Sequence, residues 1–330
     1  MTTALSNTLP TLLDLAKMQG RDGSLLPVVE AMTKQSPFLR ALPWQECNDG
    51  SSHKMVTRTA LPTLVWRKLN QGVPASKGRT DPVKETTGQL AGRSEVDVDL
   101  VRNPKNGPAF RASEDAAFTA SFKNDLESAF FYSSQKTDPD QVHGLAPRLD
   151  AKSGAAYGNQ VITSQVTGSG DDNTSAWFVN FGPKRVYGLY PEGMPTGLQM
   201  DDRGKIDVDD ADGNPYPAWV TDFRWTCGFA VEDYRYVVRL ASIDSGDLAK
   251  TGKLLIEDFV IAYHQVQDWE GTGAIFVNRL LSTYLHLQAL DTVKNSTLTI
   301  RDIGGTPVVH FLNIPIYVTD ALLNTEADIA

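Results

Sequence analysis

The stretch from Phe110 to Ser133 reads FRASEDAAFTASFKNDLESAFFYS and carries the clearest helical pattern in the chain. Apolar side chains recur every four residues along one slowly drifting stripe, at Phe118, Phe122, Leu126 and Phe130. Ser113 is a candidate N-cap, because acids follow it where the helix dipole favours negative charge. The pattern predicts a helix from Ser113 to Ser133, about 30 Å long. Such a helix is either an ordinary core helix or a long support for other elements.

Upstream of this helix, residues 54–101 have the pattern of a long two-stranded excursion. Lys54 to Leu69 is rich in Val, Thr, Leu and Trp, and Asn70 to Thr87 is polar, mildly basic and broken by Gly and Pro. Glu95 to Leu100 alternates apolar and acidic residues, which is the strongest strand pattern in the chain. An isolated hairpin is marginal in water. The excursion therefore packs on its own domain or borrows a surface from a neighbouring molecule.

Downstream of the helix, the sequence predicts a sheet followed by two helices and a final hairpin. Loops are expected from Asp138 to Ser175, with a short strand at Val161. The predicted strands are 176–181, 186–190, 221–230 and 234–243, and the predicted helices are 253–266 and 274–290. The final hairpin joins 298–300 to 308–318 across Gly304 and Gly305. This order of elements indicates an α+β fold and not a βαβ alternation.

Composition and charge indicate a cytoplasmic globular protein with a real core. The chain of 330 residues has a net charge of -9 and a pI of about 5.1, which argues against tight binding of a nucleic-acid backbone. Cys47 and Cys227 lack a CxxC pattern or a neighbouring histidine cluster, so reduced thiols are expected. No secretory signal and no apolar run of membrane-spanning length is recognisable.

Catalytic and cofactor motifs are missing from the sequence. It holds no phosphate-binding loop, no GxGxxG, no nucleophile elbow and no HExxH, and its five histidines are scattered. The acidic segment Asp201–Asn214 fails the spacing of a calcium loop and is expected to be a solvated turn. We therefore expect no catalytic residue, no cofactor and no metal. A cytoplasmic hydrolase with paired acids, from Asp201 to Asp212 or at Glu232 and Asp233, remains an alternative.

Blocks spread in order over most of the chain resemble the major capsid protein of short-tailed bacteriophages, whose shells have the Hong Kong 97 fold. These blocks are TALPTLVWRKLNQGVP from Thr59 to Pro74, SEVDVD from Ser94 to Asp99, FGPKRVYGLYP from Phe181 to Pro191, CGFAVEDYRYVVR from Cys227 to Arg239, Asn278–Arg279 before Leu280–Leu290, NIPI from Asn313 to Ile316, and TDALLNTEA from Thr319 to Ala327.

The resemblance implies a division of the chain into four parts. Residues 1–50 resemble an N-terminal arm, and 51–104 resemble the extended hairpin loop that reaches over an adjacent subunit. Residues 105–144 and 291–330 resemble a peripheral domain with its spine helix at 113–133. Residues 145–290 resemble the axial domain. The implied function is a structural protein that assembles as hexamers and pentamers into the icosahedral head enclosing the phage genome.

The same resemblance implies the partners and the location. The partners are further copies of the chain, a separate scaffolding protein, a portal and a decoration protein, and the head encloses double-stranded DNA without specific binding. The protein is expected in the virion after assembly in the host cytoplasm, with no membrane involved. A decoration or tail protein of a phage is the other structural alternative.

Six residues are expected to contact a neighbouring subunit, from their placement in the excursion: Trp66, Arg67, Val73, Lys77, Asp97 and Asp99. The competing interpretation places each of them on a local surface of a monomer.

Overall fold

The computed structural model describes Pro10 and residues 36–102, 107–152, 157–166, 172–210, 212–246, 248, 255–290, 298–303 and 306–329. Most of the expected arm, residues 1–50, lies outside the described residues, and so does the Gly304–Gly305 turn. No helix among the described residues is long and apolar enough to cross a membrane.

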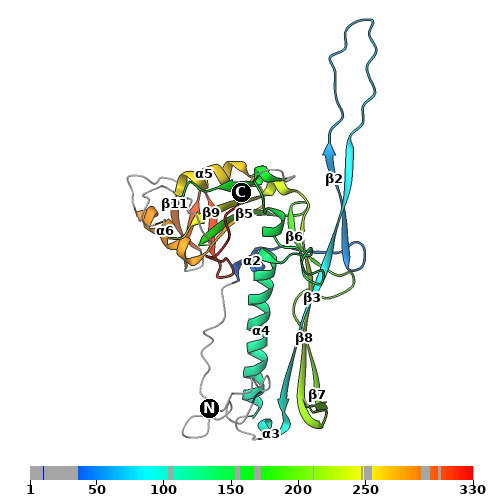
Figure 1. Cartoon of the computed structure of the whole chain (residues 1–330), viewed down its shortest axis with the longest axis vertical. Helices are drawn as coiled ribbons and strands as arrows, with labels where there is room; N and C mark the ends of the chain where they lie inside the picture. Colours follow the sequence, from blue (N-terminus) through cyan, green and yellow to red (C-terminus); the bar gives the residue numbers. More distant parts are fainter. Residues whose placement is uncertain are drawn as a thin grey trace. The chain divides into compact units, whose positions relative to one another are not determined.

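The structure is a mixed α+β fold, as expected (Figure 1). Its helices are α2 (Pro37–Ala41), α3 (Val98–Val101), α4 (Gly107–Tyr132), α5 (Leu255–Gln265) and α6 (Arg279–Leu290), with 3-10 turns η1 (Ala146–Arg148), η2 (Gly158–Gln160) and η3 (Tyr234–Tyr236). Its strands are β1 (Trp44–Glu46), β2 (Ser52–Ala60), β3 (Arg79–Asp97), β4 (Val161–Thr163), β5 (Asn173–Phe181), β6 (Val186–Tyr190), β7 (Gln199–Asp209), β8 (Pro215–Val231), β9 (Val237–Asp244), β10 (Thr272–Val277), β11 (Leu298–Ile303), β12 (Thr306–Phe311) and β13 (Ile314–Val318).

The chain divides into two compact units. The helix unit groups Gln89–Ser128 with Gly197–Thr226, and the sheet unit groups Ser36–Gly88, Ala129–Thr196 and Cys227–Ala330. This grouping differs from the expected domains at two segments. Gly197–Thr226 groups with the long helix, and the C-terminal strands β12 and β13 group with the remaining strands of the expected axial domain. The reason is pairing, because β13 lies beside β10 in one sheet.

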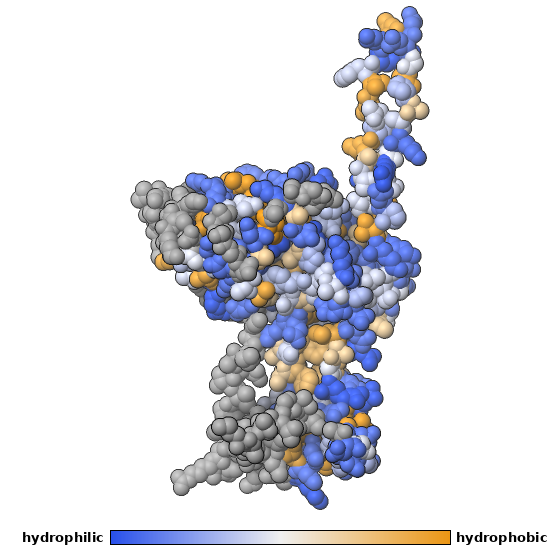
Figure 2. All heavy atoms as spheres, viewed as in Figure 1, coloured by the Kyte–Doolittle hydropathy of each residue, from blue (hydrophilic) through white to orange (hydrophobic). Residues whose placement is uncertain are grey.

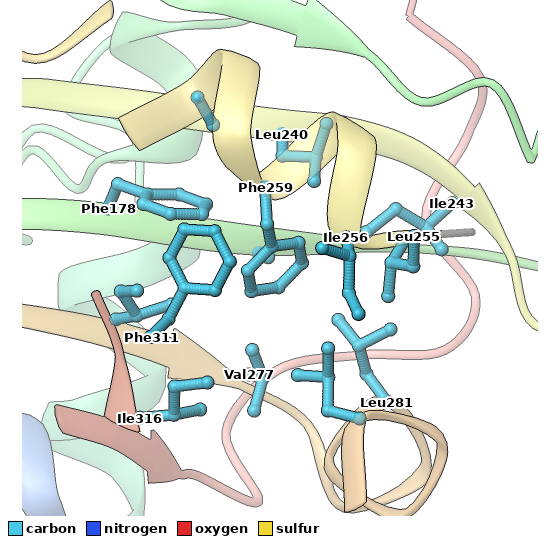
Figure 3. Packing of buried hydrophobic residues seen from close by; sticks show 14 of the residues in the cluster. Phe178, Leu240, Ile243, Leu255, Ile256, Phe259, Val277, Leu281, Phe311 and Ile316 are labelled. Atoms are coloured by element: carbon cyan, nitrogen blue, oxygen red, sulfur yellow. The ribbon is translucent and has the colours of Figure 1, made fainter. Parts of the chain in front are cut away.

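The sheet unit is built on seven strands in the order β11-β12-β13-β10-β5-β9-β4. Its core gathers apolar residues from six strands, β5 and β9 to β13, and from both helices α5 and α6. Figure 3 shows part of this packing. Phe178 and Phe259 meet edge to face with ring centroids 5.1 Å apart, and Phe259 meets Phe311 in the same way at 5.7 Å. The amphipathic helices thus bury their apolar sides on one sheet.

The predicted long helix is present, but it begins earlier than expected. α4 starts at Gly107, with Pro108 in its first turn, where the fixed φ of proline suits a helix. Ser113 lies inside the helix, so the N-cap prediction is wrong. The apolar stripe is confirmed in the helix unit, where Phe118 stacks on Phe223 of β8 at 5.4 Å.

The last turn of α4 belongs to the sheet unit and packs on α2. Phe38 of α2 contacts Phe131 at 4.9 Å and Phe276 of β10 at 5.1 Å between ring centroids. The helix ends against Gly144, whose N–H donates to Ser133 O at 2.8 Å. A Cβ on Gly144 would lie 2.8 Å from Ala129 O, so the close approach requires glycine.

Four local predictions were wrong, and each was overturned by a cap, a turn or a strand pairing. The alternating strand ends at Asp97, whose side chain accepts from Asp99 N at 2.8 Å and caps α3. Residues 274–277 form β10, because they pair with β5 and β13, and α6 follows with Asn278 Oδ1 accepting from Leu281 N at 2.7 Å. The remaining two wrong predictions concern residues 308–318 and residues 201–214.

The segment 308–318 is two strands and not one, because Leu312 and Asn313 both have positive φ and turn the chain. The acidic segment 201–214 is mostly strand and not a solvated turn. β7 pairs antiparallel with β8, and the turn between them is closed by Asp210, which accepts from the backbone N–H groups of Asp212 and Asn214.

Candidate functional site

The extended hairpin, residues 52–88 of the sheet unit, is the candidate functional site. β2 and β3 pair antiparallel from Ser52 opposite Thr86 to Ala60 opposite Arg79, with a bulge between Arg58 and Ala60. Residues 61–78 form the tip and have no strand or helix. Every residue from Thr59 to Thr80 is exposed. The sequence prediction of a two-stranded excursion is confirmed for this part, but its bounds are corrected. Residues 61–69 are not strand, and residues 79–87, expected to be a flexible link, belong to β3.

Many apolar side chains of this hairpin are exposed (Figure 2). Of the 14 exposed large hydrophobic residues among the described ones, eight lie here, at Val56, Leu61, Leu64, Val65, Trp66, Leu69, Val73 and Val83. Leu64 and Leu69 expose 90% and 94% of their surface, and Trp66 is fully exposed. Single exposed apolar residues are ordinary, but a group of this kind marks an interaction surface.

The hairpin is also basic, although the chain as a whole is acidic. Residues 52–88 hold seven Lys and Arg and two acids, so their net charge is +5 against -9 for the chain. Arg79 pairs with Asp81 at 3.2 Å, and Lys54 pairs with Asp49 at 2.8 Å. A partner surface with acidic groups therefore gains from contact with this hairpin.

The root of the hairpin is anchored by a buried ion pair. Arg148 donates from both terminal nitrogens to Glu85 of β3, at 2.5 and 2.8 Å, and also to the backbone oxygens of His143 and Phe229. Burial alone would lower the pKa of Arg148, but the hydrogen bond and charge of Glu85 outweigh it and raise that pKa. The guanidinium therefore stays charged and ties β3 to the sheet unit.

A second polar group holds β2 at the same end. Tyr187 of β6 donates to Glu232 at 3.1 Å, and its oxygen lies 3.2 Å from His53 Nε2. Burial, followed by the charge of Glu232, raises the pKa of Tyr187. Both strands of the hairpin are therefore held at its root by buried polar contacts.

The structure brings four of the six predicted contact residues together. Trp66, Arg67, Val73 and Lys77 all lie in the exposed tip. Arg67 Nε donates to Gln71 O at 3.1 Å within it. Sequence reasoning did not select Leu61, Leu64 and Leu69, although the apolar residues that recur between Leu61 and Leu69 were a usable signal.

The other two predicted contact residues, Asp97 and Asp99, lie in the helix unit and have local partners. Asp97 caps α3, and Asp99 is exposed and pairs with Arg102 at 3.4 Å. They are not part of the extended hairpin.

Three acids of the hydrolase alternative have structural partners. Asp202 accepts from Arg111 at 2.5 Å, Glu232 accepts from Tyr187, and Asp233 pairs with Arg235 at 2.6 Å. Within the described ranges, no three His, Cys, Asp or Glu side chains gather to hold a metal ion. Cys47 and Cys227 are free and buried, and burial raises the pKa of the Cys227 thiol to about 12.

Comparisons with known proteins agree with a structural role. The family model "Major capsid protein GP7" matches residues 20–330. A chain in the structure of bacteriophage Epsilon15 is 33% identical, with a TM-score of 0.78 and 99% of each chain covered. No curated protein matches the chain.

Two further structures are more distant. The capsid of a native GTA particle is 13% identical, with a TM-score of 0.41 over 66% of this chain and 92% of that one. The holo-SrpI encapsulin complex from Synechococcus elongatus PCC 7942 is 12% identical, with a TM-score of 0.44 over 72% and 97%. The family match and the Epsilon15 match confirm the capsid resemblance and the capsid fold. The chain belongs to the major capsid protein GP7 family and is a structural protein of an icosahedral bacteriophage head.

Proposed function

We propose that copies of this chain assemble as hexamers and pentamers, and that the extended hairpin of each copy lies over a neighbouring copy. The single observation that carries this proposal is the uncovered apolar tip, with Trp66 fully exposed between Leu64 and Leu69. Burying apolar surface contributes about 25 cal/mol per Å², so covering this tip with a neighbouring subunit would stabilise the contact between them. Family membership makes a further copy the natural cover.

The remaining parts take the roles implied by the family. The arm, residues 1–50, runs along another subunit, and the part within 145–290 surrounds the local symmetry axis. The net charge of -9 supports a wall that encloses double-stranded DNA without binding its phosphates, because like charges repel. A scaffolding protein, a portal and a decoration protein are separate chains, and assembly takes place in the host cytoplasm before the protein resides in the virion. The protein is not an enzyme.

The test replaces the tip and leaves the stem in place. Because Ala60 pairs with Arg79, residues 61–78 can be exchanged for Asn-Gly, a turn that joins two antiparallel strands. We expect the free subunit to keep its thermal midpoint, since residues 61–78 are all exposed and bury none of the described core residues. Shells are expected to disappear in negative-stain microscopy and sedimentation after co-expression with the other phage assembly proteins.

A point variant gives the same test with less change. Trp66→Ala is expected to reduce the yield of shells, whereas Gln71→Ala, an exposed polar residue of the same tip, is expected to leave it unchanged. Shells of normal yield from the tip-deleted chain would show that the hairpin is not an assembly contact.

A further inference from the structure

The outer edge of β2 has no paired strand among the described residues. β2 is the last strand of its sheet, with β3 as its only neighbour among the described strands. In an antiparallel pair, the backbone N–H and C=O of alternate residues point to the partner and those between them point outward. Thr87 N donates to Ser51 O across the pair at 3.0 Å, so Ser51, Met55 and Thr57 point to β3.

Even-numbered residues of β2 therefore direct their backbone groups away from β3. Pro82 agrees with this phase, because it stands opposite Val56 and has no N–H to donate. The protein itself covers the first two outward positions. Ser52 exchanges two backbone hydrogen bonds with Asp49, each 3.0 Å long, and Lys54 exchanges two with the side-chain amide of Asn48, each 2.7 Å long.

These intramolecular hydrogen bonds to the outer edge of β2 end before Val56. Within the described part of the chain, no residue hydrogen-bonds the outward backbone groups of Val56 and Arg58. The same stretch, Val56–Leu61, forms one wall of a cleft of about 730 Å³. The cleft is also lined by Tyr157 and Tyr234, whose rings stack with centroids 3.7 Å apart, and by Lys184 and Arg235.

We propose that an extended segment of a second copy of this chain enters this cleft and adds a strand to the outer edge of β2. Alternating N–H and C=O groups with a cleft beside them are the features that bind an extended backbone by strand addition. The added strand would donate to and accept from Val56 and Arg58. This inference rests on the proposed function, since the open edge lies on the hairpin that we assign to the subunit contact.

Two observations favour a second copy as the occupant. The open edge continues directly into the exposed apolar tip, so one neighbouring molecule can cover both. The side chains at the edge also suit an acidic chain, because Arg58 and Lys184 have no acidic partner within the described ranges, whereas Glu232 and Asp233 are engaged by Tyr187 and Arg235. With a net charge of -9, this chain supplies such a partner.

Hydrogen exchange tests the strand addition at single amides. In free subunits the amides of Val56 and Arg58 are expected to exchange fast, and those of Met55 and Thr57 slowly. In shells all four are expected to exchange slowly, measured by mass spectrometry with fragmentation that resolves single residues. Fast exchange at Val56 and Arg58 in intact shells would overturn the proposal, even where the tip is shown to be needed for assembly.

A photo-crosslinker identifies the occupant. Arg58→benzoylphenylalanine chains, one pool with ¹⁴N and one with ¹⁵N, are mixed and assembled, and the shells are irradiated. We expect crosslinked peptides in which one half is light and the other heavy. Crosslinks confined to one isotope place the strand within the same chain, and crosslinks to another virion protein make that protein the occupant. Either result contradicts the proposal.

A pair of proline variants provides a structural control. Val56→Pro removes an outward N–H that β3 does not use, so the hairpin and the free subunit are expected to stay intact while the shell yield falls. Val56→Ala, which keeps the N–H, is expected to retain assembly better. Thr57→Pro removes an inward N–H and is expected to disrupt the hairpin itself. Equal yields for Val56→Pro and Val56→Ala would count against strand addition.

Discussion

Glu326 is a buried carboxylate that holds the C-terminal segment on the seven-stranded sheet. It accepts from Arg239 at 2.9 Å, from Tyr132 at 2.5 Å and from the hydroxyl of Ser175. The Arg239 guanidinium also lies over the ring of Trp177, 5.1 Å from its centroid. Removing one partner of a buried pair leaves the other charge uncompensated.

We therefore expect Glu326→Ala to lower the free energy of unfolding by about 3–5 kcal/mol. Thermal and denaturant unfolding of the free subunit measures it. Asp328→Asn, at an exposed acid two residues further on, is the matched control and is expected to change little. Similar small effects for both variants would mean that the cluster does not hold the segment.

His143 makes the stability of the hairpin root depend on pH. Burial, and after it the charge of Arg148, lowers the pKa of His143 below its ordinary value. Between this lowered pKa and the unfolded value of about 6.5, the unfolded chain binds more protons than the folded chain. The free energy of unfolding therefore rises with pH in this range and is lost as the pH falls through it. We expect His143→Gln to flatten the rise of the thermal midpoint between about pH 5 and pH 7.

The charges facing His143 define the control for this experiment. Lys136 acts in the same direction as Arg148, and Glu85 and Asp150 act in the opposite one. His286→Gln, at an exposed histidine of α6, is expected to leave the pH slope as it is. If both variants keep the slope of the unsubstituted chain, other groups carry the pH dependence.

At the scale of elements, the end of α4 depends on one glycine. Leu145 N donates to Phe130 O at 2.9 Å and Gly144 N to Ser133 O, which satisfies carbonyls that the helix end would otherwise leave free. We expect Gly144→Ala to cost on the order of 1–3 kcal/mol, because its Cβ meets backbone atoms that cannot move independently.

Gly72→Ala is the matched control for this substitution. No atom lies within 4 Å of a Cβ added at Gly72, in the tip of the extended hairpin, so its effect on unfolding is expected to stay within about 0.5 kcal/mol. Comparable unfolding free energies for both alanine variants, measured by chemical denaturation, would contradict the close-approach argument.

At the scale of the whole molecule, assembly brings together many chains that each carry a charge of -9. Apolar contact at the tip favours assembly, while the summed charge opposes it. The distance over which salt screens charges is longer than about 10 Å at about 0.05 M NaCl and shorter than about 8 Å at about 0.5 M NaCl. We expect shells to form at lower subunit concentrations in the higher salt, as measured by light scattering.

The tip-deleted chain is the control, since it lacks the apolar contact and is expected to stay unassembled at either salt concentration. A rise of the required concentration with salt would show that attraction between the basic hairpin and acidic surfaces outweighs the net repulsion.

The sequence by itself determined the features that depend on local patterns. The stripe from Phe118 to Phe130 predicts α4 because side chains four residues apart share a helix face. The two-stranded excursion and the α+β order of elements followed from strand patterns and from Gly and Pro. The ordered motif blocks also predicted the capsid family, and the family match confirms it.

Only the tertiary structure decided the features that depend on pairing between distant segments. Residues 274–277, predicted as part of a helix, form a strand because β5 and β13 flank them. Gly197–Thr226, which the family resemblance assigned to the axial domain, groups with the long helix. The register of β2 on β3 leaves the backbone of Val56 and Arg58 unpaired, and no periodicity within β2 reveals this. Side-chain periodicity is local, whereas backbone hydrogen bonds between strands are satisfied by residues far away in the sequence.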